Sequence, residues 1–259
     1  MSLPPEKEIA NQFNLLIEKC FEIIRDNISA KKVSREVYIC SLYIRAIQYS
    51  KGITTLTEKN NFVSIVPLFR SSLEALVDLS NLCNHDDYVD YLTLLTLRKK
   101  RQRFSNWHKN KSNPFFPNVD EIPSEYRKIV KQNNRDLKEL KIRDFSFIKS
   151  GEELSIKRKF KLAGLEYVYE SIYDLNSSDA HNDLSSLTSK HLLEKDNAEL
   201  VISSENKDGL DSIKPHIITL SGLLINALEE VFIFFNKKNF NQFNEILIEE
   251  NQKLKELVN

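Results

Sequence analysis

Residues 61–82 constrain the fold most, because this stretch is almost wholly apolar and has the periodicity of a helix. At about 100° per residue, its large apolar side chains share one helical face. These side chains belong to Phe62, Ile65, Val66, Phe69, Leu73, Leu76 and Val77. The pattern predicts a long buried helix, and we expect the other elements of the chain to pack around it.

Three polar residues, Arg70, Glu74 and Asn81, lie along the edge of that apolar face. Arg70 and Glu74 are four residues apart, so their side chains can meet. A charged pair beside an apolar face is costly unless it is paired and hydrogen-bonded. We therefore expect both residues to be largely buried, either as a structural ion pair or as charged groups that face a cleft. Pro67 removes one backbone donor and predicts a kink near Arg70.

The composition favours long helices, because the 259 residues include only 5 Gly and 7 Pro. Lys and Arg number 37, as do Asp and Glu, so the net charge is zero and nucleic-acid binding would require a local basic patch. We expect a cytoplasmic protein, because the N-terminus has no apolar signal region and no membrane-spanning run is evident. The three cysteines, Cys20, Cys40 and Cys83, are predicted to be reduced core thiols.

The periodicity predicts an all-α fold: one domain over residues 1–259, a bundle of about eight or nine helices. We expect a mobile insert at 105–150 and a loop at 194–212. Helices are predicted from Pro5, over about 33–56, from Glu152 to just before His181, over about 215–235, and after Asn239.

The helix expected after Glu152 carries a polar ridge beside its apolar stripe. The ridge residues are Tyr169, Tyr173, Ser177 and His181, each four residues after the last. His181 ends the ridge and has aspartates close by in the sequence, so it is our candidate for acid–base chemistry. The alternative is a histidine at a helix end that bonds only to the backbone.

A basic segment, 98–109, contains Arg98, Arg101, Arg103 and Trp107. It is either a solvated helix end, where cations suit the helix dipole, or a surface that holds RNA phosphates with Trp107 stacking on a base. The sequence contains no glycine-rich phosphate loop, no Cys/His metal motif and no nucleophile elbow. We therefore expect neither a cofactor nor a metal.

The motif LFRSSLEALVDL at 68–79, with Tyr173, Ser177 and His181 about 100 residues later, resembles an uncharacterised bacterial helical family known as a domain of unknown function. The segments 46–82 and 152–187 both fit that pattern. The resemblance implies that Arg70, Glu74, Tyr173, Ser177 and His181 meet across two helices. His181, Arg70 and Glu74 would then form the catalytic set, and Tyr173, Ser177, Tyr169 and Asn81 the binding set.

The segment from Arg103 to His108 also resembles HEPN-type helical ribonucleases, which carry an arginine followed a few residues later by a histidine near a helix end. Phe104 departs from that pattern, because a polar residue often follows the arginine in the family. This resemblance implies a metal-independent ribonuclease with Arg103 and His108 at its active site, working as a homodimer.

Three hypotheses of function follow. The first is a protein with a polar inter-helix pocket that binds a small or nucleotide-like ligand, within a bacterial defence or toxin system. The second is the ribonuclease, in which a histidine transfers a proton and an arginine stabilises the phosphate charge. The third is a non-enzymatic helical interaction module.

Overall fold

The structure is a computed structural model. It describes residues 3–31, 34–109, 131–132, 134–136, 138, 142–150, 152–174, 192–194, 200–202 and 209–259. The chain divides into two compact units, one formed by 1–84 with 156–259 and the other by 85–155. We call them the bundle unit and the second unit, and each is described by itself. The predicted all-α class is confirmed.

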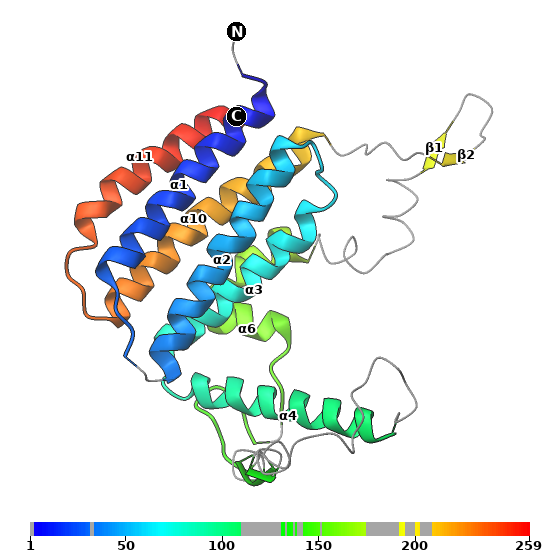
Figure 1. Ribbon diagram of the computed structural model, residues 1–259, viewed down its shortest axis with the longest axis vertical. Helices are drawn as coiled ribbons and strands as arrows, with labels where there is room; N and C mark the ends of the chain where they lie inside the picture. The colour runs from blue at the N-terminus through cyan, green and yellow to red at the C-terminus, as the bar shows by residue number, and fades with distance from the viewer. Residues whose placement is uncertain are drawn as a thin grey trace. The chain divides into compact units, whose positions relative to one another are not determined.

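Five long helices build the bundle unit: α1 (Pro5–Asn27), α2 (Ser34–Glu58), α3 (Ile65–Asn84), α10 (Leu210–Phe234) and α11 (Asn241–Val258). They lie side by side, and the start of α1 and the end of α11 are found at one end of the bundle (Figure 1). Helix α1 packs against α2, α10 and α11, while α3 packs against α2 and α10.

Local sequence explains where α1 and α10 form. Pro5 takes the first position of α1, and Glu6 and Glu8 place negative charge in its first turn, where the helix dipole favours it. Helix α10 is long and apolar enough to span a membrane by length and composition. In the bundle it contacts α1, α2, α3 and α11, and Leu220, Leu224 and Leu228 are fully buried. A core helix of a bundle therefore accounts for its apolar character.

Helix α3 begins at Ile65, later than predicted, and Phe62 is buried just before it. Pro67 is the third residue of this helix and lies in its first turn. Backbone N–H groups there have no partner within the helix, so Pro67 removes no helical hydrogen bond. The missing donor of Pro67 therefore gives no reason for a kink near Arg70, and the kink itself stays a prediction.

The prediction of a single helix after Glu152 is also wrong. The structure has α6 (Ile156–Leu162), α7 (Glu166–Val168) and the π-helix η2 (Tyr169–Tyr173). Gly164 separates α6 from α7 with a φ of 71°, a left-handed conformation that glycine adopts without steric cost. The Leu165 N–H donates to the Phe160 carbonyl over 2.8 Å and closes the end of α6.

Strands β1 (Leu192–Glu194) and β2 (Leu200–Ile202) pair antiparallel, with Leu192 opposite Ile202. The loop predicted at 194–212 is therefore interrupted by β2, and α10 already begins at Leu210. The run Leu200–Ile202 contains two β-branched residues, which favour an extended backbone.

The second unit contains α4 (Tyr88–Lys109) and the segment 142–150. Aromatic rings hold it together: Tyr91 lies edge-on to Phe145 and Phe147, at centroid distances of 5.8 and 5.6 Å. The Tyr91 hydroxyl also accepts a hydrogen bond from the Leu154 N–H over 2.9 Å. The mobility predicted for 105–150 stays a prediction, since most of 110–141 falls outside the described residues.

All three cysteines are free. Cys20 is fully buried, and burial raises the pKa of its thiol to about 12. Cys40 and Cys83 are only half-buried, so the prediction of core thiols is wrong for these two. Both lie near helix ends rather than in the centre of the bundle, Cys40 in the second turn of α2 and Cys83 in the last turn of α3.

Candidate functional site

The polar edge of α3 faces α6 and η2. The Asp78 carboxylate pairs with the Lys159 ammonium, Oδ1 to Nζ, at 3.0 Å. The Asn81 amide donates to the Lys159 carbonyl over 3.0 Å. Arg70 and Glu74 lie on the same edge, closer to the N-terminus of α3, and both contact Tyr173. Each of these polar side chains on α3 therefore contacts a group on α6 or η2, in the segment that follows the second unit.

The Tyr173 hydroxyl links the two charged residues of α3. The Arg70 Nη2 donates to Tyr173 Oη over 2.9 Å, and Tyr173 Oη donates to Glu74 Oε1 over 2.6 Å. The Arg70 guanidinium carbon also lies 4.7 Å from the centroid of the Tyr173 ring, in cation–π range. Within the described part of the chain, no ion pair joins Arg70 directly to Glu74. The direct pairing that we predicted is replaced by a tyrosine bridge.

Burial differs along this bridge. Tyr173 is 3% exposed, Arg70 is half-buried and Glu74 is exposed. Our expectation of two largely buried charges is therefore wrong for Glu74, because the edge of α3 at this turn opens to solvent. Burial, followed by the hydrogen bond to Glu74, raises the pKa of Tyr173 to about 12. Its phenol is therefore protonated at neutral pH and can act as a donor.

Tyr169 extends the arrangement on the side of η2. Its ring stacks on that of Tyr173, with centroids 5.4 Å apart and planes at 24°. The Lys157 ammonium lies 5.6 Å from the Tyr169 centroid, and Phe160 packs 4.8 Å from Tyr173. The Asp174 N–H donates to the Tyr169 carbonyl over 2.9 Å, five residues back, as in a π-helix. Such turns are frequent at functional sites. We call Arg70, Glu74, Tyr169 and Tyr173 the Tyr173 site.

A family model matches residues 36–199. The chain belongs to the DUF5677 family, a family of unknown function. The matched range of this DUF5677 chain includes α3, α4, α6, α7, η2 and all but the first two residues of α2, and hence every residue of the Tyr173 site. Our prediction of an uncharacterised domain family is confirmed. Curated proteins and solved structures give no match to the chain.

The structure brings together part of the cluster that we predicted for the DUF5677 chain. Arg70, Glu74 and Tyr173 meet, and Tyr169 stacks beside them. Asn81 is fully buried about two turns beyond Glu74, so it packs between helices and does not face solvent. Ser177 and His181 lie outside the described residues, and their place in the cluster stays a prediction.

The alternative site lies on α4 in the second unit. Arg101 and Arg103 are exposed, and Arg98 is half-buried with its Nη1 3.9 Å from the Glu153 carboxylate. Trp107 and His108 belong to α4, but their side chains lie outside what the structure describes. The proposed pairing of Arg103 with His108 therefore stays a prediction.

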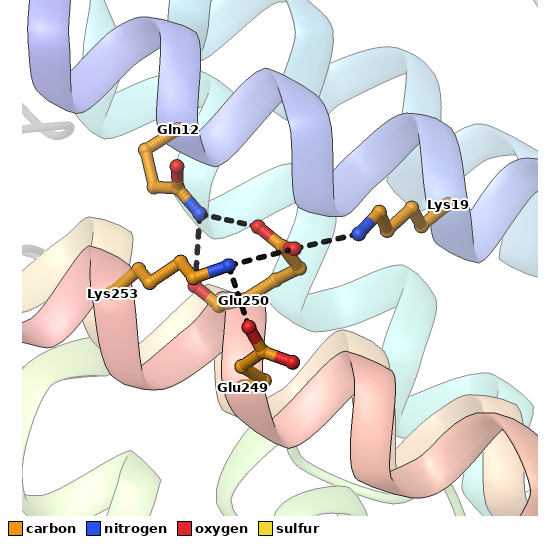
Figure 2. A network of polar contacts seen from close by, with 5 residues as sticks. All are labelled: Gln12, Lys19, Glu249, Glu250 and Lys253. Atoms are coloured by element: carbon orange, nitrogen blue, oxygen red, sulfur yellow. Dashed lines mark hydrogen bonds and ion pairs between the residues drawn. The ribbon is translucent and has the colours of Figure 1, made fainter.

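Sequence reasoning missed the network around Glu250, which joins α11 to α1. Figure 2 shows this carboxylate between Gln12 and Lys19 of α1 and Lys253 of its own helix. Its Oε1 lies 2.6 Å from Lys19 Nζ, and this contact lowers the pKa of Glu250 to about 2. The sequence does contain a signal of its burial, because Glu250 lies on the apolar stripe of α11, between Leu247 and Leu254.

Proposed function

We propose that this DUF5677 chain binds a small anionic, nucleotide-like ligand at the Tyr173 site. The observation that carries the proposal is the state of Arg70. Its guanidinium is held in place by a tyrosine hydroxyl and ring, and among the described ion pairs none joins it directly to a carboxylate, so N–H donors of its fork stay available. Arginine offers five N–H donors in a planar fork, and phosphate accepts two of them at once.

The neighbours of Arg70 supply the other contacts that a nucleotide would need. Glu74 is exposed, and its carboxylate can accept a hydrogen bond from a hydroxyl or an amino group. The ring of Tyr173 is buried and serves to position Arg70, whereas Tyr169 is half-buried, so part of its side chain is open to solvent. The site therefore combines a positive charge on Arg70, a hydrogen-bond acceptor on Glu74 and an aromatic ring on Tyr169. This combination suits a ligand that carries an anion, hydroxyl groups and a base.

The test is ligand binding with the full chain. Calorimetric titration with ATP, GTP, cyclic AMP and inorganic phosphate should reveal at least one nucleotide that binds more tightly than phosphate. Saturation at about 100 times Kd should stabilise the fold by about 2.7 kcal/mol, read as a raised Tm. Arg70→Ala should weaken binding about 10- to 100-fold, because a charge-assisted hydrogen bond contributes about 1.5–3 kcal/mol.

The matched control is Arg45→Ala, which removes an exposed arginine from α2 in the same unit. It should leave binding unchanged. Arg70→Lys keeps the charge but loses the planar fork, so it should bind less tightly than wild type. Equal loss in the Arg70 and Arg45 variants, or phosphate binding as tight as that of every nucleotide, would overturn the proposal. The defence or toxin role expected from the sequence would follow only from the identity of the ligand.

A further inference from the structure

The second half of α4 carries an unusual concentration of one charge. Five cations, Lys99, Lys100, Arg101, Arg103 and Lys109, are all exposed. The stretch 91–109 contains no Asp or Glu, although acidic and basic residues are equally numerous in the whole chain. Among the described ion pairs, none involves these five residues, whereas Arg25, Lys51 and Lys157 elsewhere each pair with a carboxylate.

The cations surround the helix. At about 100° per residue, Lys99, Lys100 and Arg103 fall on one side of α4, and Arg101 and Lys109 on the other. From Lys99 to Lys109 they span about 15 Å along its axis. A rigid duplex would meet only one of these sides, whereas a flexible single strand can follow both. The remaining described side chains in this part of α4 that are exposed are polar: Gln102, Ser105 and Asn106.

We infer that this half of α4 binds the phosphodiester backbone of a single-stranded nucleic acid, independently of the Tyr173 site. Phosphate contacts from Lys and Arg supply most of the affinity of sequence-independent binding. The exposed side chains described in 98–109 are all charged or polar, which suits a polyanion, whereas the side chains of Phe104 and Trp107 lie outside the described residues.

The experiment measures fluorescence anisotropy of labelled oligouridylate, of the same oligonucleotide as DNA, and of a duplex, each titrated with the full chain. Five phosphate contacts on a single strand predict a salt slope of about −3.5. Affinity should then fall roughly 100-fold between about 50 and 200 mM salt. RNA and DNA strands should both bind, and both should bind more tightly than the duplex.

The decisive variant replaces Lys99, Lys100 and Arg103 with Gln. Two cations remain, so its salt slope should fall to about −1.4 and its affinity should drop only about 7-fold over the same salt range. The control variant replaces Lys59, Lys237 and Lys238 with Gln. These are exposed cations of the bundle unit, and the change in net charge is the same. Its slope and affinity should match those of wild type.

Folding is checked by circular dichroism and melting, and a second variant guards against an indirect effect. Lys99→Arg with Lys100→Arg and Arg103→Lys keeps every charge and should bind as wild type does. The inference is overturned if wild type does not bind at low salt, or if the two glutamine variants lose affinity equally. It is equally overturned if polyglutamate competes as well as oligouridylate, which would indicate an acidic protein partner, or if the duplex binds more tightly.

Discussion

At the scale of single residues, Tyr173 holds Arg70 and Glu74 in place better than a direct ion pair between them would. An exposed Arg–Glu pair contributes only about 0–1 kcal/mol, because water solvates both charges. A buried phenol that accepts from Arg70 and donates to Glu74 makes two charge-assisted hydrogen bonds in a fixed geometry. The phenol therefore fixes the direction in which Arg70 points, which is what a binding site requires.

Tyr173→Phe should lower the free energy of unfolding by about 1–2 kcal/mol at neutral pH, because it removes both hydrogen bonds and keeps the ring. Urea unfolding followed by circular dichroism measures this. Tyr167→Phe is the control, since Tyr167 is 63% exposed and should change nothing. Equal stability of the two variants would show that the bridge does not contribute to folding.

The same variant tests the protonation of Tyr173. Its pKa rises from an ordinary value of 10.0 to about 12 on folding, so folding favours the protonated phenol. The associated stability is complete below pH 10 and is lost as the pH rises from 10 towards about 12, at up to about 1.4 kcal/mol per pH unit. Wild type should therefore lose stability more steeply than Tyr173→Phe in that window. Parallel curves would contradict the raised pKa.

At the scale of elements, Glu250 holds the last helix to the first. It is 5% exposed in the interface of α1 and α11, and Gln12 and Lys19 satisfy its carboxylate oxygens. Glu249, one residue earlier, pairs with Lys253 at 2.7 Å but has a 66% exposed side chain. Substitution of each of these adjacent glutamates in turn therefore separates the effect of burial on stability from that of charge (Figure 2).

Glu250→Gln should destabilise the bundle by about 1–2 kcal/mol, because it weakens charge-assisted hydrogen bonds in a helix interface. Glu249→Gln should cost less than about 0.5 kcal/mol. The pKa of Glu250 falls from 4.5 to about 2 on folding, so its contribution is present above pH 4.5 and is lost as the pH falls towards 2. Thermal melting across this range should show a steeper acid-dependent loss of stability in wild type than in Glu250→Gln.

At the scale of the whole molecule, the bundle unit is built from two separate stretches of the chain. The chain leaves it after Asn84 and returns at Ile156. Near this break, Asp78 and Asn81 of the first stretch both contact Lys159 of the second. The ends at which residues 85–155 enter and leave are therefore close in space, as is typical where one compact unit is inserted into another.

Replacement of residues 85–155 by a short glycine–serine linker should leave a bundle that unfolds cooperatively, because the linker closes a short gap. Circular dichroism should show a helical protein with a single melting transition. The ligand affinity of the Tyr173 site should persist, and salt-dependent binding of a single strand should disappear. A shortened chain that is unfolded or aggregated would show that the bundle unit depends on residues 85–155.

The sequence alone determined the helical class, the main helices and the residues that line the core, because these depend on apolar periodicity and on scarce Gly and Pro. It also singled out Arg70, Glu74 and Tyr173. Tertiary structure alone decided that Tyr173 bridges the two charges, that Glu74 faces solvent and that η2 is a π-helix. Periodicity records which face of a helix is apolar, whereas pairing and exposure depend on what a distant segment places opposite that face.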